Sequence, residues 1–119
     1  TRFTMKLFRD GILMRTFPVG LGANDSTPTG NFRIVNKITN PDWYNRGQVV
    51  EAGDPNNPLG DLWMGLGKGG RKTPYGIHPT NEPESIGQQK SQGCIRMRPE
   101  DANTLFRVCP IGTPVHILP

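Results

Sequence analysis

Residues 91–97 of the chain read Ser-Gln-Gly-Cys-Ile-Arg-Met and place Cys94 directly after a glycine. Glycine permits a sharp backbone turn there, because it accepts backbone angles that other residues avoid. Such a turn can expose the sulfur and direct the N–H groups of Gly93, Cys94 and Gln92 toward one point, which is the arrangement of an oxyanion hole. We interpret Cys94 as a candidate nucleophile, with a small buried hydrophobic residue as the alternative.

A thiol attacks as its thiolate, so a nucleophilic cysteine needs a nearby base or positive charge. The chain has two histidines. His78 precedes Cys94 by sixteen positions, which is long enough for the chain to loop back. His116 lies between Val115 and Ile117, and strand alternation would turn it away from the core, so we interpret it as a solvated strand residue. His78 is therefore the candidate base.

Two structural alternatives use the same residues. Cys94 and Cys109 form a disulfide in one of them, which would silence the nucleophile. His78, Cys94, Cys109 and His116 bind zinc in the other, although they lack the closely spaced pairs that usually make such sites. We expect no metal and no organic cofactor.

The composition is that of one ordinary domain of 119 residues, with 34% hydrophobic and 20% charged residues. That length is enough for one hydrophobic core. The 15 glycines and 12 prolines are scattered, which is typical of a mainly β domain with many tight turns. We therefore expect a single domain spanning residues 1–119.

The charge balance is basic, with a formal net charge of +4. A basic surface attracts anionic partners. The densest cluster, Lys68, Arg71 and Lys72, lies in a glycine-rich stretch with few aromatic neighbours, so we expect no nucleic-acid binding. No apolar run reaches the roughly eighteen residues of a membrane-spanning helix, so we expect no transmembrane segment.

Short segments of alternating apolar and polar residues, bounded by Gly, Pro, Asn and Asp, predict strands. In chain order, these are residues 3–8, 12–19, 31–38, 62–66, 75–78, 94–97 and 115–118. Asp10-Gly11 predicts a hairpin turn between the first two strands. We expect loops at residues 39–61 and 67–74 and a helical turn at 83–88.

Residues Pro99–Val108 predict the one clear helix. Pro99 suits the first helical position, Glu100 and Asp101 suit the N-terminal dipole, and Arg107 suits the C-terminal end. The stretch Gly65–Gly70 matches G-x-G-x-x-G, but no helix pattern follows it, so we interpret the match as a product of glycine richness.

Several motifs occur together in a fixed order along the chain. They are FPVG at 17–20, TPTGNF at 27–32, NPDW at 40–43, NPLG at 57–60, IHPT at 77–80, SQGCIRM at 91–97 and GTPV at 112–115. In these motifs the chain resembles the L,D-transpeptidase catalytic domain, also called the YkuD domain, over nearly its whole length. Two positions depart from the family pattern, since Pro79 often is glycine and Gln92 often is histidine in the family.

The resemblance implies a mainly β, β-sandwich-like fold with one short helix after the cysteine. It implies an enzyme of the cell envelope that cleaves the terminal D-Ala from a peptidoglycan tetrapeptide stem through a cysteine thioester and transfers the acyl group to an amine of another stem. The partners implied are donor and acceptor stem peptides, with carbapenems as inhibitors. We expect a monomer. The alternatives are an L,D-carboxypeptidase, which hydrolyses the same bond, and an inactive wall-binding module.

The resemblance assigns roles to residues of this chain. Cys94 is the nucleophile, His78 the general base and acid, Gly93 an oxyanion N–H donor, and the Pro79 carbonyl orients His78. If residues 94–97 are extended, Arg96 shares a face with Cys94, where it binds a substrate carboxylate or forms a structural salt bridge. The further candidates for substrate contact are Ser91, Gln92, Tyr75, Thr80 and Trp43.

Overall fold

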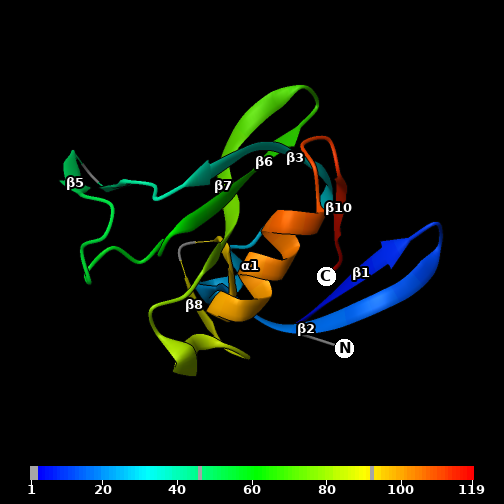
Figure 1. Ribbon diagram of the computed structural model, residues 1–119, viewed down its shortest axis with the longest axis horizontal. Coiled ribbons are helices and arrows are strands. Elements are labelled where there is room, and N and C mark those ends of the chain that lie inside the picture. Colours follow the sequence, from blue (N-terminus) through cyan, green and yellow to red (C-terminus); the bar gives the residue numbers. More distant parts are fainter. Residues whose placement is uncertain (1–2, 46, 92) are drawn as a thin grey trace.

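The protein is built on a mixed β-sheet with strand order β1-β2-β9-β7-β6-β3-β10, seen in Figure 1 as a strongly curled surface. This computed structural model describes residues 3–45, 47–91 and 93–119. The strands of this path are β1 (Thr4–Arg9), β2 (Ile12–Gly22), β9 (Ile95–Met97), β7 (Arg71–Pro79), β6 (Leu62–Lys68), β3 (Gly30–Thr39) and β10 (Pro114–Ile117).

Three shorter strands and three helical segments complete the described chain. Strand β8 (Gln89–Ser91) pairs with β2, while β4 (Trp43–Asn45) and β5 (Gln48–Val50) form a separate two-stranded hairpin. The helices are the 3₁₀ turns η1 (Ala23–Asp25) and η2 (Pro83–Ser85) and the α-helix α1 (Pro99–Val108). No helix among the described residues has the length and apolar character needed to cross a membrane.

The parallel pairing of β7 with β9 brings the two principal sequence motifs side by side. Ile77 lies opposite Ile95, and His78 lies opposite Arg96. Every other neighbouring pair along the main sheet path is antiparallel. A parallel pair needs a crossover connection, and the chain between β7 and β9 passes through η2 and through β8, which pairs with β2.

The hydrophobic core lies between the curled sheet and α1. It includes Phe17, Ile34, Met64, Leu66, Ile77 and Met97, each at most 1% exposed. Helix α1 turns Ala102 and Leu105 toward this core and packs against β6 and β7. At its first turn the Arg98 Nε donates to Asp101 Oδ2 over 2.8 Å, and this pair holds the helix start. The helix thus fixes the end of β9, which carries the residues after Cys94.

Several expectations from the sequence are confirmed. The fold is mainly β with one short helix, and the helix spans Pro99–Val108 as expected. Asp10 and Gly11 both have positive φ, 51° and 78°, and form the turn of the first hairpin. His116 is exposed on β10, where its Nδ1 lies 2.5 Å from Asn31 Oδ1.

Other boundaries were wrong. The segment 67–74, expected to be a loop, continues β6 and begins β7, because Gly69 and Gly70 supply the two positive φ angles of a tight turn. The segment 39–61 contains the β4–β5 hairpin rather than loop alone. Strand β2 extends to Gly22, β9 begins at Ile95 rather than Cys94, and the expected helical turn 83–88 shrinks to Pro83–Ser85.

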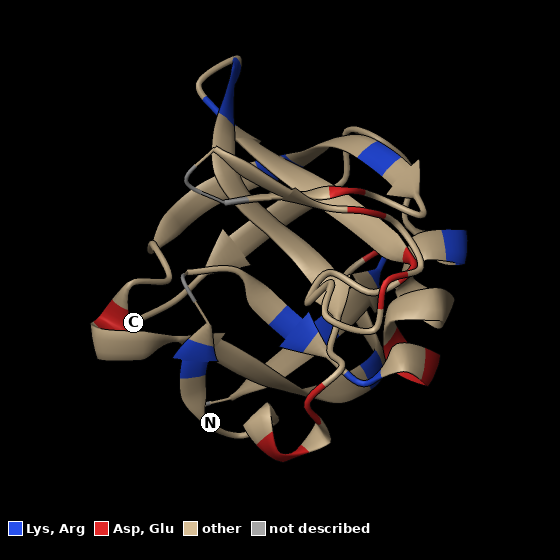
Figure 2. Ribbon diagram, turned by 90° about the vertical axis from the view of Figure 1, so that its left-hand side faces the viewer, with Lys and Arg blue, Asp and Glu red and all other residues tan. Residues whose placement is uncertain are grey.

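The charged residues are distributed over several elements (Figure 2), with both signs present on the face shown.

Hydrogen bonds of Asn57 hold the segment between β3 and β6 in place. Its buried Nδ2 donates to the carbonyl of Pro41 at 2.8 Å and also contacts those of Val50 and Glu51 at 3.3 Å. The amide thus attaches both ends of the β4–β5 hairpin region to the turn before β6, which places Trp43 and Tyr44 at the rim of a cavity.

Candidate active site

Cys94 and His78 line one cavity of about 860 Å³. Its lining residues come from β6, β7, β8 and β9, from the β4–β5 hairpin and from the segments before β6 and after β7. Aromatic side chains are prominent among its lining residues, which include Trp43, Tyr44, Trp63, Tyr75, Asn81, Glu82, Lys90, Ser91 and Arg96. A cavity that combines an apolar wall with a few polar and titratable groups is the usual form of a ligand site.

The Cys94 thiol is partly exposed and faces the edge of β7. Its Sγ lies 4.0 Å from the carbonyl oxygen of Pro74. Burial raises the pKa of Cys94 above its ordinary value of 9.0, while a hydrogen bond from the Gly76 backbone and the positive charge of Arg96 act in the opposite direction. The resting sulfur is therefore a protonated thiol at neutral pH and needs a base when it attacks.

His78 is 3% exposed, and its Nδ1 lies 2.8 Å from the Pro79 carbonyl oxygen. A carbonyl only accepts, so Nδ1 carries the proton and Nε2 presents its lone pair. Burial, followed by the charge of Arg96, lowers the pKa of His78 to about 4 against the raising effect of the Pro79 carbonyl. The imidazole is therefore neutral at pH 7, in the form that accepts a proton.

Trp63 holds the His78 ring from one side. The two rings stack with centroids 6.0 Å apart and an angle of 21° between their planes. Gly76 makes this possible, because a Cβ at that position would collide with the Trp63 indole. The Pro79 carbonyl and the Trp63 ring together fix both the tautomer and the orientation of His78.

The turn before Cys94 is held by Ser91. Its Oγ donates to the Cys94 carbonyl at 2.6 Å and accepts from the Gly93 N–H at 3.2 Å. Gly93 has a φ of 120°, and a Cβ there would lie 2.5 Å from the Tyr75 ring, so only glycine fits. The Gly93 N–H, expected to serve an oxyanion, is thus engaged by Ser91. The next backbone N–H along the chain, that of Cys94, adjoins the thiol.

Arg96 brings a positive charge to the cavity, which Lys90 also lines. It follows Cys94 by two positions on β9 and lies opposite His78. Its Nη1 is buried and has no hydrogen-bond partner in the described part of the chain. The salt bridge considered from the sequence is therefore not made by this atom. A buried guanidinium nitrogen without a partner is costly unless an anion binds to it.

Of the remaining residues predicted to contact substrate, some line the cavity and one lies outside its lining. Tyr75 and Trp43 line the cavity, as does Ser91. Thr80 is buried outside the cavity lining, and its hydroxyl is used locally, because it lies 3.1 Å from the Glu82 carbonyl and 3.2 Å from Ser85 Oγ. Gln92 lies outside the described residues.

The structural alternatives for the cysteines do not fit this geometry. Cys94 and Cys109 are both free, and Cys109 is buried at 5% exposure at the C-terminal end of α1. Within residues 3–45, 47–91 and 93–119, no three His, Cys, Asp or Glu side chains come together as a set of metal ligands.

Sequence reasoning missed Trp63, Asn81 and Lys90 as cavity residues. Trp63 sits between the buried residues Leu62 and Met64, so alternation places it on the opposite face of β6. A large aromatic residue on the face of β6 opposite the core could have indicated a cavity residue from the sequence. Its stacking on His78 depends on the register of β6 against β7, where Met64 lies opposite Ile77.

One cavity thus holds a neutral histidine, a thiol and a guanidinium with a buried, unpaired nitrogen, which is a set of groups suited to cysteine-nucleophile acyl transfer. Comparison with known proteins is consistent with that chemistry. The L,D-transpeptidase catalytic domain model, YkuD, matches residues 1–117. The chain belongs to the L,D-transpeptidase catalytic domain family.

Individual relatives agree with this assignment. Putative L,D-transpeptidase YqjB of Bacillus subtilis is 45% identical over 95 residues, covering 79% of this chain and 53% of the relative. Putative L,D-transpeptidase YkuD of Bacillus licheniformis is 38% identical over 117 residues, covering 98% of this chain and 60% of the relative. The chain thus spans somewhat more than half the length of these curated relatives.

A solved structure shows the same fold. The catalytic domain of an Enterococcus faecium L,D-transpeptidase acylated by ertapenem superimposes with a TM-score of 0.70 at 26% identity. The match covers 98% of this chain and 89% of that domain.

The buried neutral state of His78 predicts an acid-sensitive fold. The pKa of His78 is 6.5 in the unfolded chain and about 4 in the folded one, so the unfolded chain binds the proton first as the pH falls. The free energy of unfolding is therefore at its full value above pH 6.5 and decreases as the pH falls toward 4. We expect wild type to lose about 2 kcal/mol of unfolding free energy between pH 7 and pH 5 from this group. Urea unfolding of wild type and His78→Gln at both pH values measures it. A loss of equal size in His78→Gln would contradict this origin.

Proposed function

We propose that this chain is the catalytic domain of an L,D-transpeptidase. It cleaves the terminal D-Ala from a peptidoglycan tetrapeptide stem and transfers the acyl group to an amine of another stem, within the cell envelope. The observation that carries the proposal is the cavity in which a neutral, oriented His78 accompanies the Cys94 thiol and the unpaired Arg96 Nη1.

The first half of the reaction forms a thioester. Cys94 Sγ attacks the carbonyl carbon of the third stem residue while its proton passes to His78 Nε2. The Cys94 N–H, which adjoins the attacking sulfur, stabilises the oxyanion. The C–N bond to D-Ala then breaks, and the amine of D-Ala leaves with the proton from His78.

The second half resolves the thioester. An acceptor amine attacks the acyl carbon as His78 takes its proton, and the C–S bond breaks to return Cys94. The sulfur regains the proton from His78, so the site ends in its starting protonation state. His78 Nε2 acts as the base in both halves, while the Pro79 carbonyl holds Nδ1 and the Trp63 ring stacks on the imidazole.

Arg96 binds a carboxylate of the donor stem in this proposal, because its Nη1 is buried at the cavity without a partner. We expect Arg96→Gln to lower kcat/KM for a stem with free carboxylates by roughly 10- to 100-fold, the loss typical of one charge-assisted hydrogen bond. The effect should be much smaller for a stem in which the recognised carboxylate is amidated. Steady-state assays on both stems, with wild type alongside, measure the difference. An equal loss on both stems would show that Arg96 has a structural role.

The function is tested by supplying the purified protein with a disaccharide-tetrapeptide and separating the products by mass spectrometry. Transpeptidation predicts release of D-Ala together with a dimer linked between two third-position residues. Release of D-Ala with only the tripeptide would instead identify an L,D-carboxypeptidase. Absence of D-Ala release from a folded, reduced protein would overturn the catalytic proposal and favour a wall-binding module.

Inhibitor sensitivity follows from the same chemistry. The Enterococcus faecium domain is acylated by ertapenem. We propose that carbapenems acylate Cys94 here, since opening of the β-lactam ring produces an acyl-enzyme by the same attack and needs no metal or cofactor.

A further inference from the structure

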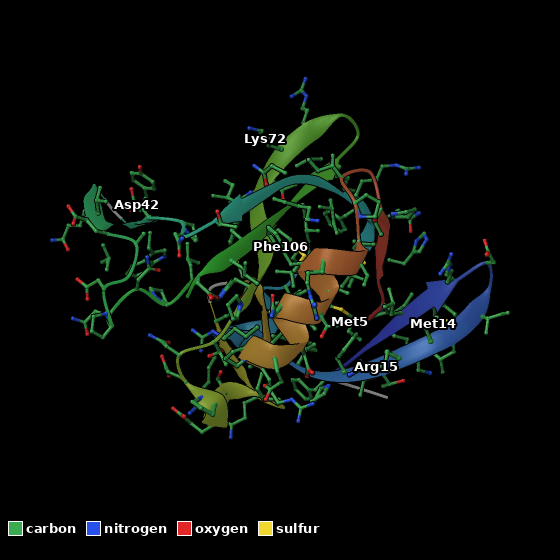
Figure 3. The ribbon with its side chains drawn as sticks, in the orientation of Figure 1. Met5, Met14, Arg15, Asp42, Lys72 and Phe106 are labelled. Carbon is green, nitrogen blue, oxygen red and sulfur yellow. The ribbon has the colours of Figure 1, made fainter. Side chains whose placement is uncertain are left out.

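The β1–β2 hairpin projects from the body of the molecule (Figure 1). Several large apolar side chains near its tip are exposed. Phe8, Ile12, Leu13 and Met14 are 57%, 65%, 48% and 53% exposed. Four large hydrophobic residues within seven consecutive positions are unusual on a solvated surface, where such residues normally occur singly. Met14 and Arg15 are labelled on this hairpin in Figure 3.

The apolar side chains are on both faces of the hairpin. Ile12 and Leu13 are neighbours in β2, so they point to opposite faces. Leu13 pairs across the hairpin with Phe8, and Ile12 pairs with Arg9. A flat protein partner would cover one face and leave the other in water. A medium that surrounds the tip would take up the apolar groups of both faces.

Cationic residues flank this apolar tip. Lys6, Arg9 and Arg15 are exposed on the same hairpin, and Asp10 is its one acidic residue, which leaves a net charge of +2 over residues 6–15. The Arg15 guanidinium lies 4.9 Å from the centre of the Phe17 ring, at the root of the hairpin. Long basic side chains reach toward anionic groups while their stems stay on apolar surface.

We propose that the β1–β2 hairpin is a membrane-docking element that inserts its tip into the interfacial region of an anionic lipid bilayer. Phe8, Ile12, Leu13 and Met14 enter the boundary between headgroups and acyl chains. Lys6, Arg9 and Arg15 contact the anionic headgroups. The polar turn at Asp10-Gly11 confines the insertion to a shallow depth, where a carboxylate keeps its hydration. The bound enzyme would be held beside the membrane face of its compartment.

Vesicle co-sedimentation tests this assignment on the intact protein. Vesicles of phosphatidylcholine with and without phosphatidylglycerol are used in low and high salt, with four variants besides wild type. Ile12→Ser/Leu13→Ser removes the apolar groups of both faces, and Lys6→Gln/Arg9→Gln removes charge. Ile111→Ser is the matched control, because Ile111 is 61% exposed but lies in the turn after α1. Asp10→Asn tests the depth limit.

Wild type and Ile111→Ser are expected to bind vesicles containing phosphatidylglycerol and to be released by high salt. Both double variants should bind at least tenfold more weakly, and Asp10→Asn should bind more tightly. Carbapenem acylation rates in solution should be unchanged in every variant, which also shows that each is folded. The proposal is overturned if wild type ignores anionic vesicles, as a hairpin reserved for a protein partner would. It is also overturned if Ile111→Ser weakens binding as much as Ile12→Ser/Leu13→Ser.

Discussion

Cys94→Ala is expected to abolish acylation by a carbapenem completely, while wild type gains one adduct per chain. The reason is that Cys94 is the thiol that lines the cavity, whereas Cys109, the other cysteine of the chain, is buried and apart from the cavity lining. Intact-mass spectrometry before and after incubation gives the stoichiometry directly.

Cys109→Ala is the matched control, since it removes the other thiol and should retain the full adduct. Because Cys109 lies in the core, thermal unfolding is used first to check that the Cys109→Ala variant is folded. An adduct that persists in Cys94→Ala, or its absence from folded and reduced wild type, would refute Cys94 as the nucleophile.

His78→Ala is expected to slow acylation by a factor on the order of 10²–10⁴, the usual contribution of a positioned general base. The pH profile carries more information than the rate. With His78 neutral down to about pH 4 and the Cys94 thiol protonated, the wild-type rate should be level near neutral pH and fall as pH approaches 4. Without the base, the rate should rise with pH in proportion to the thiolate.

Stopped-flow or mass-resolved acylation between pH 4 and 9 measures both profiles. His116→Ala serves as the control, because its ring is exposed on β10 and should leave both the rate and its pH dependence unchanged. A wild-type rate that rises steadily with pH through neutrality would show that free thiolate, rather than the His78–Cys94 pair, is the reacting form.

The parts of the fold that could be predicted were those whose cause is local. The helix Pro99–Val108 was predicted with its bounds because a proline at the start, acidic residues in the first turn and an apolar face all lie within one segment. The turn at residues 69–70 was missed although its cause is also local, since glycine richness was interpreted as a loop rather than as two positive φ angles.

Features of the site that depend on long-range register could not be predicted. The parallel pairing of β7 with β9 decides that Arg96 lies opposite His78, and no pattern within either segment encodes it. The same holds for the stacking of Trp63 on His78 and for the engagement of Gly93 by Ser91. Cys94 and Arg96 line the same cavity, although Cys94 lies just before β9 rather than in it. The unpaired state of Arg96 Nη1 appears only once every neighbour is in position.

Pro79, the residue that follows His78, illustrates which substitutions the site accepts. Proline lacks a backbone N–H but keeps its carbonyl, and the carbonyl is the group that contacts His78 Nδ1. A substitution that preserves the acceptor therefore preserves the histidine tautomer.

The raised pKa of Cys94 has a consequence for the lifetime of the protein. Peroxides and disulfides react with thiolates far faster than with thiols, so a sulfur that keeps its proton at rest is a poor target for oxidants. In the proposed mechanism, the thiolate forms only when His78 accepts the proton during attack on an acyl donor. The burial that makes the thiol depend on His78 in that mechanism also protects it from oxidants between turnovers.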